Sequence, residues 1–180
     1  MRPPPPPPAL SPAGQPLATF SDRLLAYLID YAVFLCIGLV LAVPAVLILF
    51  FAVAPDFFEV RPDGTPVDPS FMEFFLPLLL IEAGLVVVLL VLSYVYYVEM
   101  LFRGGQTLGK RAMKIKIVPV DPDVTLTRRS AAKRWLGGYV AASFLPGFIY
   151  VDGLWQLWDK PYQQCLHDKF AATLVVKVPA

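Results

Sequence analysis

The sequence predicts an all-α membrane protein with two transmembrane helices, a broken third hydrophobic stretch and a small cytoplasmic two-stranded β element. Two observations predict the membrane class. The apolar runs Leu24–Val53 and Phe74–Val98 each hold one charged residue, Asp30 and Glu82. About 20 apolar residues suffice to cross a hydrocarbon core of about 30 Å, so each run can span. The 180-residue chain is also 57% hydrophobic and 16% charged, whereas soluble domains are about 25% charged.

The chain divides into a tail, residues 1–17, and a membrane domain, residues 18–178. The tail holds Pro3–Pro8, Pro12 and Pro16. Consecutive prolines favour an extended polyproline II helix and cannot build a core, so we expect a disordered cytoplasmic spacer. The alternative is a ligand for a proline-binding domain. Prolines also occupy the place of the apolar region of a signal peptide, which predicts an uncleaved anchor.

The first span is expected at about residues 23–53. Thr19, Ser21 or Asp22 could cap its N-terminus, because their side-chain oxygens accept hydrogen bonds from free backbone N–H groups. The second span is expected at about residues 74–98. It ends in several tyrosines, which suit the membrane interface.

The third apolar stretch, residues 135–158, permits two interpretations. Its length allows one span, but Pro146 and Gly147 favour two short helices folded back as a hairpin. The flanking segments 114–120 and 173–178 are β-branched and strand-like. If they pair as a sheet, both ends of the stretch must lie on one face, which favours the hairpin.

Charge is distributed unevenly between the loops. The loop Ala54–Glu73 is acidic, whereas the segment Glu99–Arg134 is strongly basic. The positive-inside rule therefore predicts that the basic segment and the N-terminus are cytoplasmic. Near the surface, basic residues attract anionic lipid headgroups. The residues expected to do so are Lys110, Arg111, Lys114 and Lys116.

The two carboxylates within the spans are the best candidates for chemistry. Arg23 and Asp30 lie almost two turns apart, and so on one helix face. Asp30 and Glu82 lie at similar depths from their own span ends, close enough for one polar site if the helices face each other. Such carboxylates bind cations or relay protons. Asp152 is a further candidate acid within the third stretch.

Each carboxylate also has a purely structural interpretation, because buried carboxylates generally find partners. Asp30 could pair with a nearby guanidinium, and Glu82 could be a protonated acid bonded to a tyrosine. The candidate partners of Asp30 are Arg23, Arg128 and Arg134.

Several other classes of function are not expected. Gly104 and Gly109-Lys110 imitate the start of a phosphate-binding loop, but the next residue is Arg111 rather than Ser or Thr. His167 is the only histidine, and we expect it at the surface. No nucleophile, metal cluster or cofactor loop is visible, so we expect no enzyme activity, no cofactor and no metal. The net charge of +1 gives no reason to expect a nucleic-acid partner.

The chain resembles the RDD family of membrane proteins, named for one arginine and two aspartates. Arg23 opens the first span and Asp30 lies within it, as in that family. The second aspartate matches Asp168, with Asp152 as the less favoured alternative. The remaining signature residues resemble the family's loop after the second span and the arginine before the third stretch. They are Gly105, Gln106, Thr107, Gly109, Lys110 and Arg134.

The resemblance implies a bacterial plasma-membrane protein whose biochemical role is unsettled. It implies transport of a cation or small solute, with Arg23, Asp30 and Asp168 as ion or ligand residues. The alternative is a non-catalytic accessory or scaffold protein whose buried charges lock the fold. Transport by so few helices would require a homo-oligomer or another membrane protein, and Gly38 and Ala42 are small residues suited to helix contact.

Overall fold

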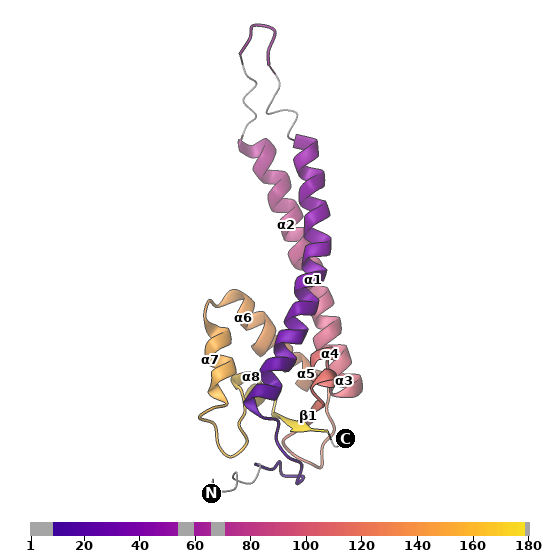
Figure 1. Ribbon diagram of the computed structural model, residues 1–180, viewed down its shortest axis with the longest axis vertical. Helices are drawn as coiled ribbons and strands as arrows, with labels where there is room; N and C mark the ends of the chain where they lie inside the picture. The colour runs from indigo at the N-terminus through magenta and orange to yellow at the C-terminus, as the bar shows by residue number, and fades with distance from the viewer. Residues whose placement is uncertain (1–8, 54–59, 66–70, 179–180) are drawn as a thin grey trace, which may run out of the picture. The chain divides into compact units, whose positions relative to one another are not determined.

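The computed structural model describes residues 9–53, 60–65 and 71–178. It forms two compact units, of which the first contains the described residues up to Tyr31 and from Ser93 onward, and the second contains Ala32–Leu92. The elements are α1 (Phe20–Val53), α2 (Phe71–Tyr94), the π-helix η2 (Val95–Glu99), α3 (Met100–Gly104), α4 (Leu108–Ala112), β1 (Ile115–Pro119), α5 (Arg128–Trp135), the π-helix η3 (Leu136–Val140), α6 (Ala141–Phe144), α7 (Phe148–Trp155), α8 (Leu166–Phe170) and β2 (Thr173–Lys177) (Figure 1).

Two helical segments, Phe20–Ala52 and Phe71–Gly104, are long and apolar enough to cross a membrane by length and composition. Only 6% and 0% of their most apolar windows are buried within the protein. The core helix of a soluble protein would bury such residues, because exposing them to water is unfavourable. The two segments contain the two predicted spans and support association with a membrane.

The N-terminus of α1 is capped by the residues that its sequence predicts. The backbone N–H of Asp22 donates to Thr19 Oγ1 at 3.2 Å, and the backbone N–H of Thr19 donates to Asp22 Oδ2 at 2.9 Å. This reciprocal pair is a capping box, which satisfies two backbone donors at the helix start.

The predicted strands form an antiparallel pair, as expected, with Ile117 opposite Val175. The chain before α1 adds to the free edge of β2, where Leu17 forms a bridge with Val176. The backbone N–H of Ala18 donates to the Val175 carbonyl at 2.9 Å. These bonds attach the start of α1 to the sheet.

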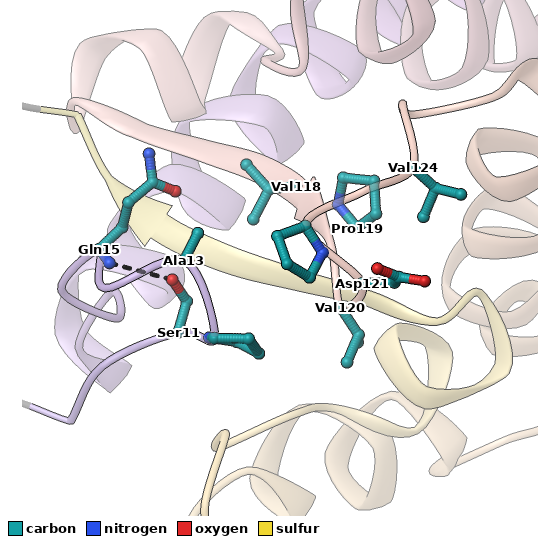
Figure 2. A pocket seen from close by; sticks show the side chains of 10 residues that line it. Ser11, Ala13, Gln15, Val118, Pro119, Val120, Asp121 and Val124 are labelled. Carbon is teal, nitrogen blue, oxygen red and sulfur yellow. Dashed lines mark hydrogen bonds between the residues drawn. The ribbon is translucent and has the colours of Figure 1, made fainter.

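Residues 9–17 of the tail that was expected to be disordered are ordered. Residues 1–8 lie outside the described residues, but residues 9–17 turn back toward the sheet. The backbone N–H of Gln15 donates to Ser11 Oγ at 3.1 Å. This turn and the chain after β1 line a cleft of about 190 Å³ (Figure 2). Ser11 and Leu17 are buried, so packing against the sheet outweighs the proline content of this segment.

The third apolar stretch folds back on itself instead of forming one straight helix. The helical segment α5–η3–α6 ends at Phe144, where Leu145 is extended and Gly147 has a φ of +80°. The short α7 then returns beside α6 (Figure 1). A glycine is favoured at this turn because a positive φ brings no side-chain clash there.

The core of the first unit lies where the sheet packs against α1, the end of the second long helical segment and α5. Ile115 and Ile117 from β1 and Val175 from β2 are almost fully buried there. The first unit also buries charged residues, which come from several elements: Arg23 and Asp30 on α1, Arg134 on α5, Asp152 on α7, Asp159 after α7 and Asp168 on α8.

Candidate functional site

The centre of the first unit is a buried carboxylate between two guanidinium groups. Asp168 on α8 is fully buried. Its Oδ2 lies 3.2 Å from Nη1 of Arg23 on α1, and its Oδ1 accepts from Nη1 of Arg134 on α5. Arg134 also donates to Thr173 Oγ1 at 2.6 Å, on β2. One carboxylate therefore joins three helices, and Arg134 extends the network to the sheet.

The surroundings of Asp168 favour its charged form. Burial is the largest single effect and opposes ionisation, but the charges of Arg134, His167 and Arg23 together outweigh it and hold the pKa of Asp168 well below its usual range. The backbone N–H of Cys165 also donates to Oδ2 at 3.1 Å. These surroundings favour the carboxylate form of Asp168, and donors from the protein occupy both of its oxygens.

His167 links this network to the folded-back α7. Its Nδ1 lies 2.6 Å from Asp152 Oδ2, and its backbone N–H donates to Asp152 Oδ1 at 2.8 Å. Its Nε2 lies 3.0 Å from Arg134 Nη2 and 3.3 Å from Asp168 Oδ1. The neutral ring accepts from Arg134, whereas the charged ring donates to Asp168. The expectation that His167 lies at the surface is wrong, because its side chain is 20% exposed and bridges two carboxylates.

We expect the stability of the protein to fall as pH rises above neutrality. Burial lowers the pKa of His167, but the Asp168 charge and hydrogen bonds to Asp152 and Asp168 raise it above its ordinary 6.5. The folded state therefore binds this proton more tightly than the unfolded state. The stabilisation is complete below pH 6.5 and is lost as pH rises through the raised pKa. Unfolding midpoints of the solubilised protein from pH 6 to pH 9 would show the decline, and His167→Gln should remove it. An equal slope in that variant would contradict the assignment.

A second buried carboxylate, Asp30, binds the start of α4. Its Oδ1 accepts from the Tyr96 hydroxyl at 2.6 Å and from the backbone N–H of Gly109 at 2.8 Å. Its Oδ2 accepts from the Thr107 hydroxyl at 2.6 Å and lies 3.7 Å from Lys110 Nζ. The cation beside Asp30 is thus Lys110, and none of the three arginines expected as partners. Arg128 instead lies 2.7 Å from Glu99.

The signature loop after the second long helical segment explains this geometry. Gly105 ends α3 with a φ of +69°, and Gln106 Nε2 donates to the Ile115 carbonyl at 2.9 Å. Thr107 caps α4, and Gly109 allows close approach, since a Cβ there would lie 2.1 Å from the Ala26 carbonyl oxygen. Each of these residue types therefore has a structural reason at its position.

Both π-helices contribute tyrosines to the same region. Tyr96 and Tyr97 lie on η2, and Tyr139 lies on η3. The Tyr97 and Tyr139 rings have centroids 5.4 Å apart. Single π-turns often occur at functional sites, because the extra residue redirects side chains that a regular helix would place elsewhere.

A cavity of about 540 Å³ lies among these groups within the first unit. It is lined by apolar side chains and by the charged groups of both carboxylate networks. The charged lining residues are Arg23, Asp30, Lys110, Arg134, Asp152, His167 and Asp168. Ligand pockets for small molecules are about 300–1,000 Å³ in volume, so the cavity has the size of a binding site.

The predicted residues are not all brought together. Arg23, Asp30, Asp152 and Asp168 line this one cavity. Glu82 is exposed on α2 and belongs to the second unit, so its shared site with Asp30 stays a prediction. Sequence reasoning missed Tyr96, Thr173 and Cys165. Thr107 and Gly109 were found through their motif, but without their contacts to Asp30.

The cavity wall contains one group of metal-ligand residue types. The ligand atoms of Cys165, His167 and Asp168 lie within 4.8 Å of one another. Asp168 is already bound to two guanidinium groups, whose charge repels a cation. Burial also raises the pKa of the Cys165 thiol, which disfavours the thiolate that binds metals. The arrangement suits an internal ion network better than a metal centre.

Together, the two apolar helices and the buried charges define a helical domain of membrane type with a polar interior. The sequence model of the RDD family matches residues 17–172, and the chain belongs to this family. No curated protein and no solved structure matches the chain.

Proposed function

We propose that this RDD protein is a multi-pass protein of the bacterial plasma membrane, with a cytoplasmic N-terminus, that binds and moves a small solute. The cavity of about 540 Å³ in the first unit carries this proposal, because it combines a ligand-sized volume with buried charged walls.

The charged walls favour binding over a purely structural role. Burying ion pairs costs desolvation, and well-packed apolar side chains would often stabilise a fold as well or better. A fold-stabilising interior would also be expected to be filled, since protein cores pack with few voids. A cavity bordered by Arg23, Lys110 and Arg134 is therefore better suited to a polar ligand.

A bare cation suits the cavity less well than the sequence predicts, because the carboxylates of the cavity already have partners. Asp30 accepts three hydrogen bonds beside its ion pair, and Asp168 lies between two arginines. Asp152 is bonded to His167 through both of its oxygens. A cation would have to displace donors that already occupy these carboxylates.

The second candidate is an accessory or scaffold protein without enzyme activity or a cofactor. It is favoured by the complete occupation of Asp168, which joins α1, α5 and α8 as a fold-locking group would. In this alternative, the cavity holds either a side chain of a partner membrane protein or a lipid molecule. Either role is compatible with a homo-oligomer and with anionic headgroups along the exposed Arg111, Lys114 and Lys116. Lys110 was expected to contact headgroups as well, but its side chain lies beside Asp30.

Transport predicts a specific loss in the Asp30→Asn variant. Asparagine keeps the shape of the side chain but removes the charge opposite Lys110, so the electrostatics of the cavity change. We expect Asp30→Asn to remain folded and inserted while losing flux. Ion-gradient-driven uptake of Na⁺, K⁺, protons and small carboxylates into proteoliposomes would measure this.

The matched control is Asp123→Asn, which removes an exposed carboxylate that lies outside the cavity. It should retain the flux of the unmodified protein. Folding of every variant is checked by gel filtration and by circular dichroism. Equal flux in Asp30→Asn and the unmodified protein would contradict a role for this carboxylate in transport and favour the accessory role.

A further inference from the structure

The cavity walls contain hydrogen-bond donors that the protein itself leaves unused. Arg23 is 9% exposed, and its Nη1 donates to the Gln163 carbonyl at 2.7 Å and to Asp168. Its buried Nε has no hydrogen-bond partner among the residues that the structure describes. A buried donor without a partner costs about 1–3 kcal/mol, and an anion near this guanidinium would offset part of that cost through its charge.

Lys110 is the second incompletely used donor. Its ammonium carries three N–H groups, and its ion-pair distance to Asp30 Oδ2 is 3.7 Å, longer than a hydrogen bond. The Lys110 side chain is 17% exposed and lines the cavity. Burial lowers the pKa of Lys110, because desolvation disfavours the ammonium, and a further anionic neighbour would favour the charged form.

The hydrogen-bond acceptors of the cavity, in contrast, already have partners within the protein. The carboxylates of Asp30, Asp152 and Asp168 each accept at least two hydrogen bonds from the protein. The groups in the cavity that can form further hydrogen bonds are therefore the cationic donors. The rest of its surface is mostly apolar and includes Leu24, Leu28, Ile149 and Leu154.

We propose that the cavity binds an amphipathic anion, with a carboxylate or phosphate group toward Lys110 and Arg23 and an apolar body along the leucine-rich wall. This inference rests on the proposed role of the cavity as a solute site and names the chemical class of that solute. Two sources supply this chemistry: a free fatty acid and the headgroup end of an anionic phospholipid.

Binding to the full-length protein in detergent micelles tests the proposal directly. Native mass spectrometry with oleate and with phosphatidylglycerol distinguishes the two sources. Oleyl alcohol carries the apolar body without the charge, and inorganic phosphate carries the charge without the apolar body, so these two probes test the parts separately. We expect oleate or phosphatidylglycerol to bind about tenfold or more tightly than either partial ligand, since charge-assisted hydrogen bonds and apolar burial both contribute.

Two variants localise the binding to the cavity. Lys110→Met removes the ammonium but keeps an unbranched side chain, and it should weaken anion binding about tenfold. Its control is Lys116→Met, at an exposed lysine on β1. Gly153→Leu adds a side chain at the cavity wall, where a Cβ meets open space, and should also weaken binding. Its control is Gly84→Leu on α2, where a Cβ also meets open space.

The outcomes separate this inference from the proposed function. Weaker binding in both cavity variants and in neither control supports the amphipathic anion. Equal binding of oleyl alcohol, or anion binding unchanged in folded Lys110→Met and Gly153→Leu proteins, overturns it. Since binding is measured without flux, a transporter of another solute would fail this test and still lose flux in Asp30→Asn.

Discussion

Replacing Asp168 by asparagine is expected to destabilise the protein by about 3–5 kcal/mol, the cost of removing one partner from a buried ion pair. The carboxylate is fully buried and faces Arg23 and Arg134. Asparagine fills nearly the same volume, so the loss is electrostatic: two buried guanidinium groups keep their charge without the anion. Chemical unfolding of the protein in mixed micelles measures the change in the free energy of unfolding.

The control for this variant is Asp123→Asn, which changes the same group in an exposed loop. It should alter the free energy of unfolding by less than about 0.5 kcal/mol. The double variant Asp168→Asn/Arg134→Gln removes the anion together with one buried cation. It should therefore lose less stability than the sum of its single variants. A single variant as stable as the unmodified protein would show that Asp168 does not lock the fold.

The prediction of Arg23, Arg134 and Asp168 as special residues needed only the sequence. Arg23 stands out as a guanidinium at the start of an apolar helix, whereas Arg134 and Asp168 were found through the resemblance of their motifs to the RDD family. The two long apolar helices and the paired strands were also predictable, because hydropathy and alternation are local properties of the chain.

The partner of Asp30 was not predictable in the same way. Three arginines were plausible on charge alone, and the choice of Lys110 depends on where the loop after the second long helical segment places α4. Thr107 and Gly109 decide this through a helix cap and a close backbone approach. Such contacts join residues far apart in the sequence, and neither hydropathy nor periodicity reports them.

The surroundings of His167 were also not predictable from the sequence. A single histidine in a polar segment has no pattern that places it, so the surface was the simplest expectation. Its position between Asp152 and Asp168 depends on the return of α7 beside α6 and on Gly138, where a Cβ would lie 3.2 Å from the imidazole. The cavity likewise depends on how α1, η3 and α7 pack, which the sequence alone does not specify.

The substitution Gly109→Ala is expected to destabilise the first unit by at least about 2 kcal/mol through overpacking and a lost buried hydrogen bond. An added Cβ would lie 2.1 Å from the Ala26 carbonyl oxygen and 2.8 Å from Asp30 Oδ1. The first atom belongs to the backbone of α1, which cannot move aside cheaply. The start of α4 must therefore move away, and the bond from the Gly109 N–H to Asp30 lengthens.

Helix propensity alone predicts the opposite sign, since alanine stabilises a helix interior by about 1 kcal/mol relative to glycine. Gly153→Ala is the matched control, because it lies in α7 and its Cβ meets open space. It should be neutral or stabilising in the same unfolding experiment. If Gly109→Ala were equally stable, α4 would not contact α1 as closely as the geometry requires. Destabilisation of Gly109→Ala alone would show that this close approach, and with it the donors around Asp30, is maintained in the solubilised protein.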